Sequence, residues 1–214
     1  MSRSAELAAN LAEVKSRILR PDVTLIVVTK TYPLSDVEIL RDCGVENFGE
    51  NRSDEGLVKA EGVKARWHYQ GEIQSRKIKE IVRWANCIHS LDDARHAEKI
   101  SAAVTTPIDV FLQLSLDGDL ARGGVALDEL LLLANKVMQL PRINLLGMMC
   151  VPPVAEDPER AFAKIAQAHQ RFIAEYPDSP ALSAGMSGDF EIAIAHGATH
   201  IRVGSSILGP RSYH

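Results

Sequence analysis

The sequence has few cysteines, no excess of basic residues and no long apolar run. Its three cysteines, Cys43, Cys87 and Cys150, are widely separated and form neither a CxxC pair nor a disulfide framework, which predicts a reducing compartment. Lys and Arg number 24 against 28 Asp and Glu, and the net charge of −4 disfavours a nucleic-acid partner. No apolar run approaches the ~18 residues that a membrane span requires, so we expect no membrane partner.

The N-terminal segment also lacks the uncharged apolar core of a signal peptide. Arg3 and Arg17 are among the charged residues that interrupt it, while Leu7, Leu11 and Val14 recur at helical spacing. We therefore expect an amphipathic surface helix here, and a cytoplasmic protein.

Short β-rich apolar runs alternate with longer stretches of helical periodicity along the whole chain. The expected strands are Leu25–Lys30, Glu46–Gly49, Trp67–Gly71, Cys87–Ser90, Ile108–Ser115, Ile143–Cys150, Ala181–Met186 and His200–Ser205. Eight strands, each followed by a helical stretch, predict a single α/β domain over residues 1–214. It is a (β/α)8 TIM-type barrel with an extra N-terminal helix. The alternative is an open doubly wound sheet, which would more often carry a glycine-rich first turn than the Thr29–Pro33 segment found here.

Helix-end signals agree with this alternation. Those expected are capping boxes at Ser35 to Glu38 and Ser90 to Asp93, an N-cap at Asp157 before Pro158, and C-terminal glycines at Gly44 and Gly197.

Lys30 ends the first expected strand. In a barrel, functional side chains lie at the carboxyl ends of strands, and alternation places Lys30 on the face shared with Ile26 and Val28. A lysine at a low-dielectric rim can have a lowered pKa, and a neutral amine is what a Schiff-base nucleophile needs. The alternative is a solvated lysine at a strand end.

The last two expected strands run into loops of glycine and serine. Ser187 follows the seventh strand, and Gly204 and Ser205 follow the eighth. Barrels frequently bind phosphate with these two loops, because glycine lets backbone N–H groups approach the anion and serine adds a hydroxyl donor. Ser187 has a second interpretation as the N-cap of the following helix, and the two roles are compatible.

Arg202 lies inside the eighth expected strand. It shares a face with His200 and Gly204, while Ile201 and Val203 share the other face, so Arg202 is expected to point into the barrel. The alternative is a structural ion pair with a carboxylate. An arginine beside a phosphate site and a Schiff-base lysine points to pyridoxal 5′-phosphate (PLP), whose ring nitrogen takes an Asp or Arg partner.

The remaining polar candidates carry weaker signals. Asn51 and His68 lie near strand ends, where each is either a ligand contact or a structural residue of the rim. Neither HExxH nor a Cys/His pair at zinc spacing occurs, so no metal site is expected. Cys150 is expected to be a small buried apolar residue.

Six motifs, in order and at these spacings, resemble the PLP homeostasis proteins, which are related to the N-terminal barrel of alanine racemase (PLP fold-type III). They are VVTK (Val27–Lys30), NFGEN (Asn47–Asn51), WHYQGEIQ (Trp67–Gln74), GMM (Gly147–Met149), LSAGMSGD (Leu182–Asp189) and IRVGSSILGPR (Ile201–Arg211). The site residues that the resemblance implies are Lys30 for the Schiff base, Ser187, Gly204 and Ser205 for the phosphate, Arg202 for the pyridine nitrogen, and Asn51 and Met148 beside the ring.

The sequence departs from the family pattern at three places. Ala184 stands where the family usually has Met, Asp54 where it has Gln, and Arg76 where it has Asn. None of them changes the lysine, phosphate or arginine positions, so they bear on the surroundings of the site and on any partner surface.

The function that the resemblance implies is non-catalytic binding of PLP, buffering or delivering the cofactor, by a monomer that makes transient contact with PLP-dependent enzymes. One alternative is an amino-acid racemase, which needs a second base; in alanine racemase an additional domain supplies it, and we expect none here. The other is a cofactor-free Schiff-base aldolase. Its lysine usually lies on a later strand, whereas here the sixth strand ends in Met148, Met149 and Cys150.

Overall fold

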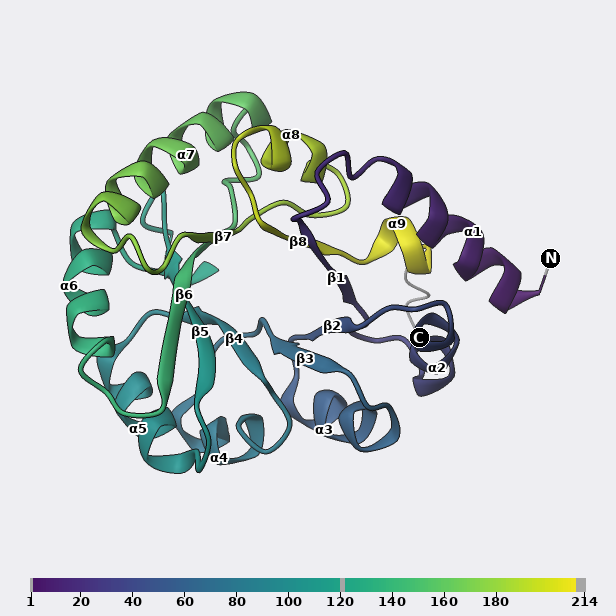
Figure 1. Cartoon of the computed structure of the whole chain (residues 1–214), viewed down its shortest axis with the longest axis horizontal. Coiled ribbons are helices and arrows are strands. Elements are labelled where there is room, and N and C mark those ends of the chain that lie inside the picture. The colour runs from purple at the N-terminus through teal and green to yellow at the C-terminus, as the bar shows by residue number, and fades with distance from the viewer. Residues whose placement is uncertain (1, 120–121, 211–214) are drawn as a thin grey trace.

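The computed structural model describes residues 2–119 and 122–210, and its strands close into a parallel barrel surrounded by helices (Figure 1). The strands are β1 (Thr24–Val28), β2 (Asn47–Glu50), β3 (Arg66–Tyr69), β4 (Cys87–Leu91), β5 (Ile108–Leu114), β6 (Ile143–Cys150), β7 (Ala181–Ser183) and β8 (His200–Val203). Each strand pairs with the next, and β1 pairs with β8, Ile26 lying opposite Arg202. The predicted (β/α)8 barrel is confirmed.

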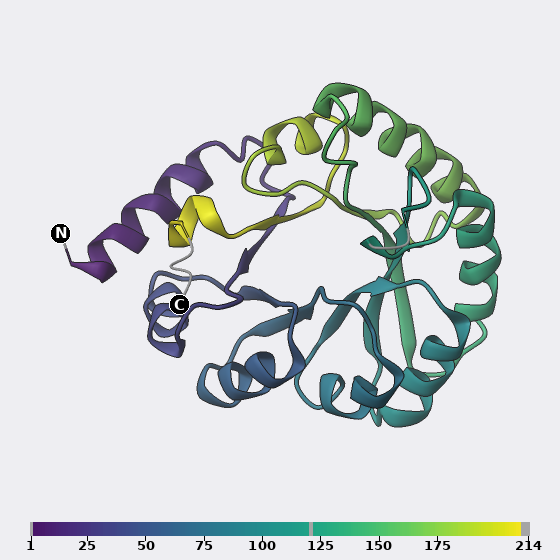
Figure 2. The ribbon, with the colours of Figure 1, turned by 180° about the vertical axis from the view of Figure 1, so that it is seen from behind.

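The helices cover the outside of the barrel (Figures 1 and 2). They are α1 (Arg3–Ser16), α2 (Leu34–Asp42), α3 (Ser53–Gly62), η1 (Ser75–Lys77), α4 (Ile78–Ile81), α5 (Ala94–Ala103), α6 (Leu127–Val137), α7 (Pro158–Glu175), α8 (Phe190–Ala195) and α9 (Ser205–Leu208). The predicted amphipathic helix is α1, which lies beside α9 and buries Leu7, Leu11 and Val14. Arg3 ties it down by donating to the Asp36 carboxylate and to the carbonyl of Leu208.

Several strands end earlier than the sequence pattern predicted. β1 ends at Val28, two residues before Lys30, and β8 ends at Val203, just before the glycine-serine loop. Lys30, Ser187 and Gly204 therefore lie in loops beyond the carboxyl ends of their strands, where a barrel carries its functional groups. Arg211, which ends the last motif, lies outside the described residues.

The helix caps follow the expectation only in part. Asp157 caps α7 by accepting from the N–H of Arg160, as expected. α5 is capped by Asp93, whereas the Ser90 hydroxyl donates to the carbonyl of Gly71, and α2 follows Pro33 without a side-chain cap, so both capping boxes were wrong. The expected glycines after α2 and α8 have positive φ, 82° at Gly44 and 97° at Gly197, as left-handed helix ends require.

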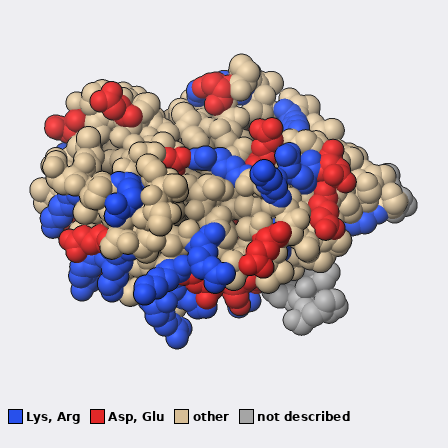
Figure 3. Space-filling model, turned by 60° about the horizontal axis from the view of Figure 1, so that its bottom comes forward, with Lys and Arg blue, Asp and Glu red and all other residues tan. Residues whose placement is uncertain are grey.

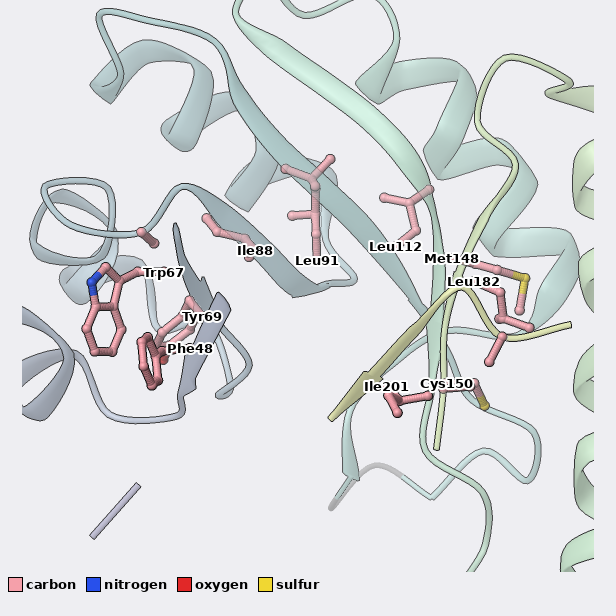
Figure 4. Packing of buried hydrophobic residues seen from close by; sticks show 14 of the residues in the cluster. Phe48, Trp67, Tyr69, Ile88, Leu91, Leu112, Met148, Cys150, Leu182 and Ile201 are labelled. Atoms are coloured by element: carbon pink, nitrogen blue, oxygen red, sulfur yellow. The ribbon is translucent and has the colours of Figure 1, made fainter. Parts of the chain in front are cut away.

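The main apolar core lies between the barrel and the helices. Figure 4 shows Phe48, Trp67 and Tyr69 packed together, with the Phe48 and Trp67 rings stacked at 5.3 Å between centroids. A second, smaller cluster of Cys87, Phe111 and Met149 lies apart from it. The interior of the barrel also holds polar side chains, with histidines, a serine and an arginine in hydrogen-bond contact.

Among the described residues, none of the helices is both long and apolar enough to span a membrane. Acidic and basic side chains are interspersed on the face shown in Figure 3, so the net charge of −4 is not segregated there.

Candidate functional site

A cavity of about 230 Å³ opens at the rim where the ends of β1 and β8 meet. Its lining residues are Val28, Lys30, Tyr32, Gln70, Met186, Ser187, Gly188, Arg202, Gly204 and Ser205. Five of the seven residues that the sequence singled out are thus brought together from the two ends of the chain. The two that the structure leaves outside this lining are Asn51 and Met148.

The segment that carries Lys30 is held by a buried charged group beneath it. The Lys59 ammonium, on α3, donates to the carbonyl of Thr29 at 2.7 Å and to Oε1 of Glu50 at 2.6 Å. The Thr29 hydroxyl donates to the same Glu50 oxygen at 2.6 Å. Burial raises the pKa of Glu50, and Lys59 opposes that shift. This clamp fixes the end of β1 against β2 and α3.

The backbone turns sharply directly after Lys30. Thr31 has a φ of 70°, a left-handed conformation that a β-branched residue adopts at a strain of about 1–3 kcal/mol. Its N–H donates to Oε2 of Glu55 at 2.8 Å. The strained residue thus directly follows Lys30, which is half-buried and lines the cavity.

Ser187 joins the two glycine-serine loops. Its hydroxyl oxygen accepts from the N–H groups of Gly204, at 3.2 Å, and Ser206, at 3.3 Å, and its carbonyl accepts from the Ser206 hydroxyl. The expected N-cap role is wrong, because α8 begins after Asp189, whose carboxylate accepts from the N–H of Met186. Ser187, Gly204 and Ser205 thus lie together at one wall of the cavity, where serine hydroxyls and backbone N–H groups are of the kind that binds an anion.

Gly204 lies close to the end of β1. A Cβ added there would lie 3.1 Å from the carbonyl oxygen of Val28, which is tighter than ordinary contact. A larger residue would require the loop after β8 or the end of β1 to shift by a few tenths of an ångström.

Arg202 points into the barrel as expected, and is 5% exposed. One terminal nitrogen donates to the Ser183 hydroxyl at 2.7 Å and the other to the carbonyl of Cys150 at 3.2 Å. Among ion pairs between described residues, none involves Arg202, so the alternative of a structural ion pair was wrong. Burial lowers the pKa of the guanidinium to about 10, which leaves it charged at neutral pH. A buried cation with only neutral partners favours a ligand that supplies an acceptor.

Asn51 lies in a neighbouring hollow, lined in part by Tyr69 and Gly71. Its side-chain oxygen is buried and has no hydrogen-bond partner among the described residues. Met148 is fully buried in the outer core, where Figure 4 shows it beside Leu182. Its neighbour Met149 contributes to the smaller cluster instead.

Sequence reasoning missed Gln70, Tyr32 and Ser183. The Gln70 side-chain nitrogen is a buried donor without a partner among the described residues, and the residue lines the cavity. Alternation in β3 offered a signal, because Trp67 and Tyr69 are outer-core residues and Gln70 continues the face of His68. The Tyr32 hydroxyl donates to the carbonyl of Gly209 at 2.6 Å.

His68, which was expected near a strand end, lies inside the barrel together with His89. Nitrogens of His68 and His89 lie with the Cys87 sulfur within 4.8 Å of one another, all buried. Burial lowers the pKa of His68 to about 3 and that of His89 well below its ordinary value, so both rings are neutral. Burial also raises the pKa of Cys87 and, as expected for a buried apolar residue, holds Cys150 as a thiol with a pKa of about 12.

Comparison with known proteins finds close relatives over almost the whole chain. A family model described as alanine racemase, N-terminal domain, matches residues 3–212. A pyridoxal phosphate homeostasis protein of Corynebacterium glutamicum is 40% identical, over 90% of this chain and 93% of that protein. One from Escherichia coli (strain K12) is 33% identical, over 97% and 98%. Among solved structures, PipY of Synechococcus elongatus with PLP bound matches with a TM-score of 0.87 at 30% identity, over 95% of this chain and 100% of that one.

Proposed function

Because the chain belongs to the pyridoxal phosphate homeostasis proteins, within the alanine racemase N-terminal domain family, we propose that it binds PLP and serves in intracellular homeostasis of that cofactor. In that role the protein buffers PLP or delivers it to PLP-dependent enzymes, by transient contact and as a monomer. The free cysteines Cys43, Cys87 and Cys150 support a cytoplasmic location.

The observation that carries the proposal is the composition of the cavity wall. PLP has an aldehyde, a phosphate and a pyridine nitrogen, and the aldehyde forms a reversible covalent bond with an amine. Lys30 supplies the amine, and Ser187 with the loop after β8 supplies donors for the phosphate. Arg202 supplies a buried donor for the ring nitrogen. Gln70 adds a donor that is buried without a partner among the described residues. The three chemical groups of PLP thus each have a matching group on one cavity.

We infer that binding occurs with little catalysis. An always-charged Arg202 facing the ring nitrogen disfavours a proton there, because two positive charges would meet. A ring without that proton withdraws electrons poorly. Racemisation also needs a base on each face of the substrate, and the Tyr32 hydroxyl is engaged with Gly209. A racemase-like enzyme is the second candidate, favoured by the shared barrel family.

Borohydride reduction tests the binding proposal. The protein is incubated with PLP, reduced, digested and mapped, and the label is expected on Lys30. After unbound PLP is removed by gel filtration, Lys30→Ala is expected to be colourless, whereas Lys79→Ala, which removes an exposed lysine of α4, stays yellow. Label on Lys59 or another lysine, with a fully yellow Lys30→Ala protein, would disprove the assignment.

Proton exchange tests the inference on catalysis. The PLP-loaded protein is incubated with L-amino acids in deuterated water, and NMR follows the Cα proton. We expect that proton to persist. Exchange or racemisation at about 1 s⁻¹ or faster, an ordinary enzyme rate, would establish the racemase-like enzyme instead.

A further inference from the structure

A continuous row of hydrogen bonds runs through the barrel interior from Arg202. The Ser183 hydroxyl, which accepts from Arg202, lies 2.8 Å from Nδ1 of His89. Nε2 of His89 lies 2.9 Å from Nδ1 of His68, and Nε2 of His68 lies 3.0 Å from the side-chain oxygen of Asn47. The side chains come from strands β2, β3, β4, β7 and β8 and form one polar core within the barrel.

The side-chain oxygen of Asn47 fixes the direction of every bond in this row, because an amide oxygen can only accept. The proton of the neutral His68 ring is therefore on Nε2, which donates to Asn47, and its Nδ1 accepts. His89 in turn carries its proton on Nε2 and donates to Nδ1 of His68, so its Nδ1 accepts from the Ser183 hydroxyl. The Ser183 oxygen accepts from Arg202, which can only donate. Each ring nitrogen has a partner, and each imidazole is neutral, in agreement with their lowered pKa values.

We propose that Ser183, His89, His68 and Asn47 are positioning residues for Arg202, forming a one-way hydrogen-bond chain that fixes the plane of the guanidinium and the tautomer of both histidines. Its consequence for the ligand rests on the proposed function. The chain supplies lone pairs but no negative charge, so Arg202 is oriented without being neutralised. A carboxylate in place of Ser183 would orient the arginine equally well and cancel the charge that the ligand meets.

The hydrogen-bond chain also accounts for the metal-like grouping of His68, Cys87 and His89. Two of the nitrogens that a metal ion would bind are already bonded to each other at 2.9 Å. The His89 ring is also stacked on Phe111, at 4.5 Å between centroids. A metal ion bound here would have to break the hydrogen bond between His68 and His89, although both rings already have hydrogen-bond partners for their nitrogens. We therefore expect no stoichiometric zinc in the purified protein.

The tautomers are measured directly, without PLP. In ¹⁵N-histidine-labelled protein, NMR is expected to show His68 and His89 protonated on Nε2 and neutral from pH 8 to pH 5. Resonances are assigned with His68→Gln and His89→Gln. Protonation on Nδ1 of either ring, titration within that range, or stoichiometric zinc in the protein as purified would overturn the chain.

The positioning of Arg202 is tested by comparing the affinities for PLP and for an analogue that lacks the ring nitrogen. The wild-type protein is expected to bind PLP about tenfold more tightly than 1-deaza-PLP, in which CH replaces the ring nitrogen, the effect of one hydrogen bond. Ser183→Ala is expected to reduce that ratio to about twofold with little change in 1-deaza-PLP affinity, and Ser183→Thr is expected to restore it. An unchanged ratio in Ser183→Ala would overturn the role.

If Ser183→Ala does not fold, a second pair of variants at His89 tests the same role. His89→Gln keeps an acceptor and a donor in the chain, whereas His89→Leu has neither, so only His89→Leu is expected to lose the discrimination. If the wild-type protein binds neither compound, the proposed function fails, and the tautomers still decide for or against the chain.

Discussion

The ammonium group of Lys59 lies 2.6 Å from the carboxylate of Glu50, and both side chains are buried directly beneath the segment that carries Lys30. Lys59→Met leaves a buried carboxylate without its cation and is expected to lower the free energy of unfolding by about 3–5 kcal/mol. Lys59→Met combined with Glu50→Gln removes both charges and is expected to recover most of that loss. Urea unfolding measures both.

The matched control is Lys79→Met, which removes an exposed lysine and is expected to change stability by less than about 0.5 kcal/mol. A loss for Lys59→Met as small as that of the control would show that the buried pair does not hold this region together.

The left-handed conformation of Thr31 gives a second prediction. Glycine tolerates this conformation and alanine does not, so Thr31→Gly is expected to be more stable than Thr31→Ala by about 1–2 kcal/mol in thermal or urea unfolding. Both variants keep the N–H that donates to Glu55. Equal stabilities would mean that the turn relaxes when the threonine is replaced.

Ser187→Ala tests the proposed phosphate contact at the wall of the cavity. Loss of a charge-assisted hydrogen bond of about 1.5–3 kcal/mol is expected to weaken PLP binding about 10- to 100-fold, with little effect on unphosphorylated pyridoxal. Ser4→Ala, at an exposed position of α1, serves as the control. A parallel loss for both ligands would place Ser187 away from the phosphate. Absorbance titration supplies the affinities.

Stability is expected to fall in mild acid because of the histidines inside the barrel. The pKa of His68 falls from 6.5 to about 3 on folding and that of His200 to about 4, and His89 shifts in the same direction. The unfolded chain therefore binds more protons below pH 6.5. The stability that the neutral rings contribute is complete above that pH and is lost as the pH decreases. Each ring adds a slope of about 1.4 kcal/mol per pH unit.

Glu50 acts in the opposite direction, because its raised pKa makes the fold bind the proton more tightly than the unfolded chain does. Urea unfolding between pH 7 and pH 4.5 measures the net slope. His89→Gln is expected to reduce it by about one histidine's share, or about 1.4 kcal/mol per pH unit. A flat profile in the wild-type protein would show that these rings are protonated in the fold.

Periodicity predicted the barrel and most of its rim, because parallel strands of a barrel end on the same side. That rule places Lys30, Arg202 and Gly204 at one end of the barrel, and the pairing of β1 with β8 brings them together. The inward direction of Arg202 followed from alternation in β8, where Ile201 and Val203 face the outer core.

The position of Met148 shows where the alternation of inward and outward side chains along β6 is interrupted. The β5–β6 register shifts between Val110 and Phe111, which leaves Leu146 without an opposite residue. Such a bulge resets the alternation, so Met149 joins the inner cluster with Phe111. The one local sign in the sequence is Gly147, because a glycine inside a strand often marks a bulge.

The polar groups that support the site were also beyond the reach of sequence patterns. Lys59 comes from a helix, and it reaches the end of β1 only because α3 packs there. The sequence placed His68 only near a strand end, whereas its bond to His89 requires β3 and β4 to be neighbours with known register. Contacts of this kind depend on the three-dimensional arrangement rather than on spacing along the chain.

Closure of the barrel between β1 and β8 also determines when the site comes into existence. During synthesis Lys30 is made just after the first strand, whereas the loop after β8 is made only after all the other strands. Until then Lys30 has no loop after β8 beside it, so on the proposed site we expect a growing chain not to retain PLP. Local opening of the same seam in the finished protein would separate the two halves of the site again. At the proposed site, we expect PLP to bind only after the barrel is complete and to slow opening of the pairing between β1 and β8.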